Sequence, residues 1–295
     1  MVFLPRGESR STQPIPVNTA RVAELLRPFL DGCRSEERCE EKAAFLSDRQ
    51  LRDISTYIDL LLRWNARINL TAIRQPEEIV TRHFGESLFA ARHLFPPGHP
   101  RVGTGVLDCP AEQNPASREE HSMDRARHLA VREGHGFSRA NHLPEEAGSA
   151  AEASADDRRP QTDDVIDIGS GAGFPGLPIK LWSPRISLTL IESNQKKVVF
   201  LREVIRAFTL MNTHVFPGRA QDFARQADVV TLRAVERFDF VLSTAASLVA
   251  PGGRLALLIG QAQVPKTMTF RDFTWQAPIP IPLSSIRALL IGRRA

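Results

Sequence analysis

Apolar residues follow two different spacings along this chain, and the change of spacing divides it into parts. Residues 20–30, 42–65 and 76–94 carry apolar side chains at intervals of three and four, the spacing of an amphipathic helix. Ser47 is a good N-cap residue within the second stretch. The pattern predicts an N-terminal helical region over residues 20–97, and core packing explains its apolar stripe.

From residue 164 onward, short apolar runs alternate with helical patterns. The predicted strands are 165–168, 187–191, 213–216, 228–232 and 254–259, and the predicted helices are 177–182, 195–208 and 238–248. Two further strands, 270–276 and 285–293, close the chain. This alternation predicts an α/β fold with a mainly parallel sheet and right-handed crossovers, to which a final hairpin adds an antiparallel strand.

Two stretches show neither spacing. Residues 1–19 are predicted to be a disordered N-terminus, and residues 101–163 a low-complexity insertion that cannot build a core. The insertion is acidic, with 8 Arg against 12 Asp and Glu, although the whole chain has a net charge of +4. The remainder is therefore basic, which favours a polyanionic partner.

Composition indicates a globular chain without a membrane span. Hydrophobic residues make up 42% and charged residues 24%, and no apolar run approaches the ~18 residues that a membrane helix needs. Cys33, Cys39 and Cys109 are odd in number and lack the spacing of metal ligands. We therefore expect a cytoplasmic protein without a metal site.

A glycine-rich stretch follows the first predicted strand. Gly171, Gly173 and Gly176 formally match the dinucleotide-binding spacing, but that match leaves Gly169 without a role. Asp167, at the end of the strand, disfavours a nearby pyrophosphate. An acid there suits a cationic ligand with a free amine, such as S-adenosylmethionine. A glycine loop without a ligand is the alternative.

Three other features have both a structural and a functional interpretation. Glu192 ends the second predicted strand, where a carboxylate can accept both hydroxyls of a ribose, or can simply precede a helix N-terminus. Residues 63–72 combine Arg, Asn and Trp, which fits either a packed polar turn or a phosphate or base contact. His83, on a predicted helix, is better explained as a structural hydrogen-bonding group than as a catalyst.

An ordered set of short motifs resembles one known family. Its members are Trp64-Asn65 with Ile68-Asn69-Leu70-Thr71, Arg82-His83 with Glu86-Ser87, Asp167 to Gly176, Lys197 to Val204, Gly218-Arg219-Ala220 and Arg233-Ala234. In this order they resemble the RsmG (GidB) family, the bacterial 16S rRNA guanine-N7 methyltransferases. The resemblance implies a class I, Rossmann-like methyltransferase core over residues 164–295, with the N-terminal helices as an extension that contacts RNA.

The resemblance and the residue pattern together define a candidate site. The predicted cofactor-binding residues for S-adenosylmethionine are Asp167, Gly169, Gly171, Gly173, Phe174, Glu192, Ala220, Gln221 and Arg233. Arg233 is also the predicted catalytic residue, because it should lie where cofactor and substrate meet. The predicted RNA-binding residues are Arg63, Arg67, Arg82, Lys196, Lys197 and Arg219. Three residues depart from the usual family pattern, namely Gln221, Leu232 and Ile259.

These observations predict a methyltransferase that forms N7-methylguanine in 16S rRNA, alone or within the small ribosomal subunit. We expect a monomer that does not bind membranes. Two alternatives stay open: a methyltransferase that acts on a protein or a small molecule, and a non-catalytic relative that binds RNA or the ribosome.

Overall fold

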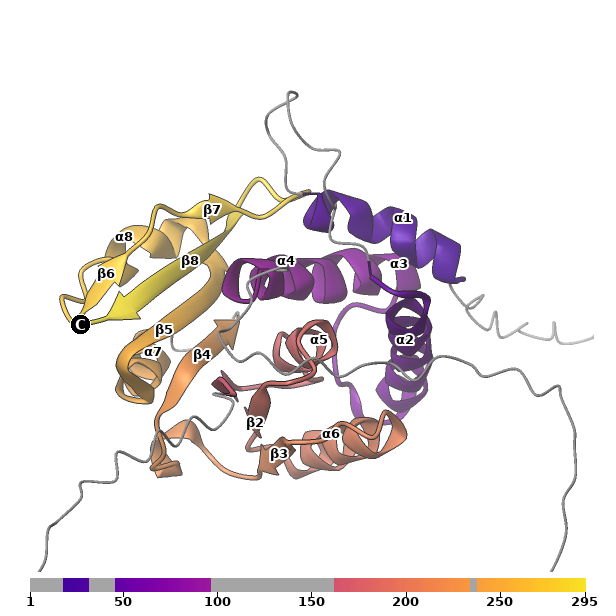
Figure 1. The fold of residues 1–295 in the computed structure, drawn as a ribbon. Helices are drawn as coiled ribbons and strands as arrows, with labels where there is room; N and C mark the ends of the chain where they lie inside the picture. Colours follow the sequence, from indigo (N-terminus) through magenta and orange to yellow (C-terminus); the bar gives the residue numbers. More distant parts are fainter. Residues whose placement is uncertain (1–17, 32–45, 97–161, 234–237) are drawn as a thin grey trace, which may run out of the picture. The chain divides into compact units, whose positions relative to one another are not determined.

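The computed structural model describes residues 18–31, 46–96, 162–233 and 238–295, and they belong to one compact unit. Eight strands form one sheet in the order β3-β2-β1-β4-β5-β8-β6, with β7 also paired to β8 (Figure 1). The strands are β1 (Asp164–Ile168), β2 (Ser187–Ile191), β3 (Thr213–Phe216), β4 (Ala227–Arg233), β5 (Val249–Gly260), β6 (Phe273–Trp275), β7 (Ile279–Pro280) and β8 (Arg287–Arg294).

The strand directions confirm the predicted fold. Strands β1 to β5 pair in parallel, whereas β8 runs antiparallel to β5, and both β6 and β7 run antiparallel to β8. In the order of the sheet, a strand of reversed direction therefore follows five parallel ones. The prediction that the chain ends in an antiparallel hairpin is therefore correct. This antiparallel part of the sheet also contains β7, a strand of two residues that was not predicted.

Helices cover both faces of the sheet (Figure 1). They are α1 (Thr19–Leu30), α2 (Asp48–Ile68), α3 (Pro76–Glu78), the π-helical segment η1 (Ile79–Gly85), α4 (Glu86–Leu94), α5 (Gly176–Trp182), α6 (Gln195–Ala207), α7 (Phe238–Ser247) and α8 (Val264–Thr267). Two 3₁₀ turns, η2 (Ala220–Asp222) and η3 (Gln261–Gln263), complete the assignment of the described residues.

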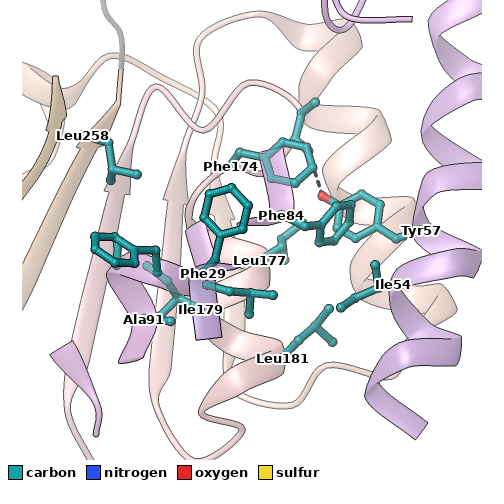
Figure 2. Packing of buried hydrophobic residues seen from close by; sticks show 14 of the residues in the cluster. Phe29, Ile54, Tyr57, Phe84, Ala91, Phe174, Leu177, Ile179, Leu181 and Leu258 are labelled. Carbon is teal, nitrogen blue, oxygen red and sulfur yellow. Dashed lines mark hydrogen bonds between the residues drawn. The ribbon is translucent and has the colours of Figure 1, made fainter. Parts of the chain in front are cut away.

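Alternate strand residues point to opposite faces and build two separate cores. Val165 of β1 belongs to the core that α1, α2, α4, α5 and α6 share, whereas its neighbour Ile166 belongs to the core that contains α7. The N-terminal helices thus share the first core with the sheet, as Figure 2 shows for Tyr57, Phe84 and Phe174. Side chains that point to this face at the strand ends are directed toward the N-terminal helices.

Helix boundaries follow local sequence signals. The Asn18 side chain accepts a hydrogen bond from the backbone N–H of Arg21, so α1 begins at Thr19 and the predicted disorder is wrong for residues 18 and 19. Ser47 and Gln50 form a reciprocal capping box at the start of α2. The single helix predicted over 76–94 is present, but its centre is the π-helical segment η1.

Several predictions concern residues outside the described ranges. They include the disorder of residues 1–17, most of the insertion at 101–163, and the state of Cys33, Cys39 and Cys109. In the described part of the chain, no helix has the length and apolar character needed to cross a membrane.

Candidate cofactor and substrate site

The glycine loop after β1 requires backbone conformations that side chains disfavour. Gly169, Gly171 and Gly173 have φ values of 66°, 59° and 89°, all in the left-handed region. The backbone N–H of Ser170 donates to the carbonyl of Ile191 at 3.1 Å, which ties the loop to the end of β2. The loop therefore lies at the carboxyl edge of the parallel strands, where ligands bind in open α/β sheets.

The buried side chain of Asp167 holds the end of this loop by a hydrogen bond. Its carboxylate is fully buried and accepts hydrogen bonds from the Gly176 N–H at 3.1 Å and the Thr231 hydroxyl at 2.8 Å. Burial raises the pKa of Asp167 to about 6, and these hydrogen bonds oppose the rise. A Cβ at position 176 would lie 2.8 Å from the Asp167 Oδ2 atom, so the glycine allows helix α5 to start against the acid.

A pocket opens beside the loop on the face covered by α7. It brings together five of the residues predicted from sequence, namely Gly169, Glu192, Arg219, Ala220 and Gln221. The other predicted cofactor residues do not line this pocket: Gly171, Gly173 and Phe174 lie farther along the loop, Asp167 lies beneath it, and Arg233 ends β4.

Glu192 is the pocket's acidic group. It is 7% exposed, and its Oε1 and Oε2 atoms accept backbone hydrogen bonds from Asn194 at 2.7 Å and Gly171 at 2.9 Å. Each oxygen of a carboxylate has two lone pairs, so both retain one for a further donor. Glu192 can therefore accept the two hydroxyls of a ribose while it fixes the loop.

The remaining walls of the pocket are largely apolar. Ile168 and Ile191 come from the strand ends, and Phe240 and Val241 come from the first turn of α7. The Phe240 side chain is 59% exposed, which is unusual for a large aromatic group and provides a flat surface for a base. The sequence analysis missed both α7 residues. An aromatic residue at the start of the helix after β4 is the signal that could have indicated them.

Arg233 is held on the opposite face of the sheet, the face covered by the N-terminal helices. Its Nη2 atom donates to the Glu86 carboxylate at 3.1 Å and to the Arg82 carbonyl at 2.5 Å. Burial lowers the pKa of Arg233 to about 10, and Glu86 opposes that change. Arg233 is therefore fixed and still cationic at neutral pH.

Glu86 gathers cations from three separate elements. Its side chain is 4% exposed and also pairs with Arg287 of β8 at 3.1 Å and with Arg82 of η1 at 3.9 Å. Arg82 also pairs with Glu78 at 3.5 Å, so three arginines meet two carboxylates, and the cluster keeps a net positive charge that suits an anionic ligand. The sequence analysis missed Arg287, because a lone arginine at a strand start carries no distinctive pattern.

The predicted RNA-binding residues come from several elements. Arg63 and Arg67 are exposed near the end of α2, and the Arg82 side chain is 49% exposed. Lys196 is exposed and Lys197 partly exposed in the first turn of α6, and Arg219 is exposed at the rim of the pocket. All six side chains reach solvent.

The polar turn after α2 is at least partly structural. The Asn65 side chain donates to the Thr71 carbonyl at 3.0 Å and accepts from the Thr71 N–H at 2.9 Å. Asn69 ends the helix in the left-handed conformation with φ 51°, and Trp64 packs edge-on against Phe200 at 5.8 Å. The packing interpretation therefore holds for these three residues, while the neighbouring arginines stay available.

Two of the three departures from the family pattern are core positions. Leu232 and Ile259 are buried in the core that faces α7, so neither side chain faces a ligand. Gln221, in contrast, is exposed at the pocket, where its amide can still form hydrogen bonds.

Comparisons with known proteins agree with this arrangement. The sequence profile of the GidB family, described as rRNA small subunit methyltransferase G, matches residues 50–105 and 146–274. Ribosomal RNA small subunit methyltransferase G of Streptococcus pyogenes serotype M12 is 28% identical over 229 residues, covering 76% of this chain and 70% of that protein. The protein of the same name from Alkaliphilus metalliredigens is 27% identical over 224 residues, covering 74% and 67%.

Among solved structures, a SAM dependent methyltransferase from Aquifex aeolicus is 14% identical, with a TM-score of 0.39 over 45% of this chain and 82% of that chain. The family profile spans more than half of the 295 residues and includes every predicted cofactor-binding and RNA-binding residue. The chain belongs to the GidB family of rRNA small subunit methyltransferases, enzymes whose methyl donor is S-adenosylmethionine.

Proposed function

We propose that this protein transfers a methyl group to N7 of a guanine in 16S rRNA. The observation that carries the proposal is the presence of two unlike surfaces at the carboxyl edge of the sheet, one on each face. The Glu192 pocket provides a carboxylate and apolar walls, and the Glu86 cluster provides excess positive charge. The first suits a nucleoside with a cationic centre, and the second suits a polyanion.

The residues of the pocket fit S-adenosylmethionine. Glu192 would accept the ribose hydroxyls, and the walls formed with Phe240 and Ala220 would enclose the adenine. Gln221 offers an amide to the edge of the base. Asp167 would attract the amine of the methionine end by its charge, through a water where its own hydrogen bonds leave no direct access.

The reaction at guanine N7 needs no general base. N7 has an in-plane lone pair that is unprotonated at neutral pH, and the bound donor supplies an electrophilic methyl group on its sulfonium. His83 could not serve as a strong base, because burial lowers its pKa to about 3 and both ring nitrogens have hydrogen-bonding partners. The protein's task is to align the reactants and exclude water.

Arg233 is the proposed positioning and catalytic residue on the acceptor side. A guanidinium can only donate hydrogen bonds, so it suits the O6 atom of guanine or a phosphate oxygen. Its fixed geometry against Glu86 would hold that acceptor in one place. The exposed residues Arg63, Arg67, Arg82, Lys196, Lys197 and Arg219 are the proposed contacts to the RNA backbone.

The RNA partner is 16S rRNA, either free or assembled in the small subunit, and we propose that the enzyme acts as a monomer in the cytoplasm. The deciding experiment incubates the protein with labelled S-adenosylmethionine and either deproteinised 16S rRNA or assembled small subunits. We expect N7-methylguanine in nucleoside digests of one of these substrates. Label that appears only in protein or small molecules would favour the second class of methyltransferase. Binding of RNA without any transfer would favour a non-catalytic relative.

A further inference from the structure

The N-terminal helices contact the glycine loop directly, through the only tyrosine of the chain. The Tyr57 hydroxyl of α2 donates a hydrogen bond to the Ala172 carbonyl at 2.7 Å (Figure 2). The Tyr57 ring also stacks on Phe174, with centroids 5.6 Å apart and planes inclined by 15°. Tyr57 is fully buried, so both contacts occur without competition from water.

The loop fits closely around this hydroxyl. Gly173 has a φ of 89°, and a Cβ built on it would overlap the Tyr57 oxygen and the Leu177 side chain. The backbone at Gly173, between the Ala172 carbonyl and the Phe174 ring, therefore has no room for a side chain. Removal of the hydroxyl would leave the Ala172 carbonyl without its donor and open space beside the most constrained residue of the loop.

His83 contacts the same aromatic ring. It stacks on Phe174 with ring centroids 4.6 Å apart and planes inclined by 16°, so two rings from the N-terminal helices both stack on Phe174. The His83 Nδ1 atom lies 3.2 Å from Arg233 Nη1, and its Nε2 atom lies 2.8 Å from the Thr71 hydroxyl. One side chain thus touches both the cofactor loop and the residue proposed to hold the acceptor.

The partners of His83 determine its tautomer. A guanidinium only donates, so Nδ1 must accept from Arg233, and the ring proton must reside on Nε2. That proton is donated to the Thr71 hydroxyl, which accepts a further hydrogen bond from the Ile73 N–H at 3.2 Å. Protonation of Nδ1 would place two cations side by side, which agrees with a ring that stays neutral.

We propose that Tyr57 and His83 are positioning residues for the methyl donor, which hold the glycine loop through the Ala172 carbonyl and the Phe174 ring and set its geometry relative to Arg233. The inference rests on the proposed function only in assuming that S-adenosylmethionine binds at this loop. It assigns to the N-terminal helices a role in donor binding that is separate from contact with RNA.

A purely structural role for Tyr57 predicts a different outcome from a positioning role. Loss of packing alone would lower the melting temperature and leave donor affinity unchanged once the protein is folded. Loss of positioning would weaken the donor even in a fully folded variant, because binding would then have to order the loop. The affinity measured without RNA separates the two explanations.

The test measures the Kd for S-adenosylmethionine by calorimetry, well below the melting temperature of each variant. We expect Tyr57→Phe to weaken binding about 3- to 10-fold, which corresponds to one lost buried hydrogen bond. The matched control is Trp182→Phe, which removes a hydrogen bond of 2.9 Å from the Trp182 indole to the Phe95 carbonyl, outside the loop. The control should lower stability and keep the wild-type Kd.

Single-turnover methylation of 16S rRNA supplies the second readout. Saturating donor should restore the Tyr57→Phe rate, because that variant loses mainly donor affinity. His83→Gln should raise the KM for the donor and also keep a reduced rate at saturation, because Arg233 loses a partner. A wild-type Kd in Tyr57→Phe, or equal weakening in Trp182→Phe, would overturn the proposal. If the wild-type protein itself fails to bind the donor, the proposed function fails instead.

Discussion

Asp167 fixes the glycine loop by a hydrogen bond, but its buried charge lowers the stability of the folded protein. Burial raises its pKa to about 6, so above that pH the folded protein holds a carboxylate that would be better solvated after unfolding. Burial favours the protonated form of Asp167 in the folded state. The stabilisation that comes from binding this proton is complete at low pH, below the unfolded pKa. It is lost as the pH rises through the folded pKa.

Relative to wild type, Asp167→Asn should therefore have a more favourable free energy of unfolding at pH 8 than at pH 4.5. An asparagine can accept from the Gly176 N–H and donate to the Thr231 hydroxyl, which can then turn toward the Ile166 carbonyl. We expect the stability difference between variant and wild type to grow by about 2 kcal/mol over this range, as measured by urea unfolding. Other titrating groups cancel in that difference.

Asp59→Asn, an exposed substitution on α2, is the matched control for the removal of one carboxylate. A pH-independent difference for Asp167→Asn would show that burial does not raise the pKa of Asp167. Loss of donor binding in Asp167→Asn, with stability gained, would support its proposed role toward the amine.

Glu192 carries the most direct prediction for the cofactor. Glu192→Ala removes the pocket's carboxylate and should weaken S-adenosylmethionine by about 1.5–3 kcal/mol, the scale of a charge-assisted hydrogen bond. Calorimetry would then show a Kd about 10- to 150-fold higher, since about 1.4 kcal/mol corresponds to a factor of ten. Glu203→Ala on α6, outside the pocket lining, is the control. Tight binding of NADH without binding of S-adenosylmethionine would exclude this cofactor.

The residue pattern predicted some of these side chains and could not predict others. Gly169 and Glu192 stand at strand ends, where the topology itself brings groups to one edge, so sequence spacing was sufficient. Arg287 joins Glu86 across 201 positions through the antiparallel return of β8. Such a pairing depends on three-dimensional packing, and no spacing rule along the chain encodes it.

At the scale of elements, helix α2 has one buried stripe and an exposed row of arginines near each end. Arg63 and Arg67 near its C-terminus are the predicted phosphate contacts. The double variant Arg63→Glu/Arg67→Glu should bind 16S rRNA more weakly and with a smaller salt dependence. Each lost phosphate contact should reduce the slope of log K against log salt by about 0.7–0.9.

The same helix provides the control for this prediction. Arg49→Glu/Arg52→Glu reverses two exposed charges near the N-terminus of α2 and keeps the change in net charge equal. Filter binding at several salt concentrations should distinguish the two variants. Equal slopes for both would indicate that this helix contributes only long-range attraction and makes no phosphate contact.

The elements themselves were largely predictable, because apolar spacing reflects burial on one face or on two. The parallel strands appeared where predicted, with ends shifted by a few residues. The π-helical segment Ile79–Gly85 could not be predicted, since it keeps the apolar pattern of an α-helix. The two-residue strand β7 was hidden in a proline-rich stretch that reads as a loop.

The mechanism is tested on the whole molecule. With N7 as the nucleophile, no side chain must change protonation, so single-turnover rates at saturating donor and RNA should be nearly flat from about pH 6.5 to 9. A general base would contribute about 10²–10⁴-fold and impose its own pKa on the rate.

An acidic limb that one Asp, Glu or His substitution removes would contradict this mechanism. It would indicate a substrate whose nucleophile starts protonated, such as an exocyclic amine or a hydroxyl. The RNA fold must be checked at each pH by an independent probe, because a change in substrate structure would produce a limb that no substitution abolishes.

The contacts between the N-terminal helices and the sheet with its glycine loop also limit how this protein can be recombined. Glu86 forms ion pairs with Arg233 and Arg287, and Tyr57 donates a hydrogen bond to Ala172 of the loop. Each of these interactions has one partner in the N-terminal helices and the other in the sheet or its glycine loop. A chimera that takes its helices from one homologue and its sheet from another would pair unmatched halves, with a buried charge unbalanced. A chimera should therefore stay functional only when both residues of each contact come from the same homologue, whichever segments they belong to.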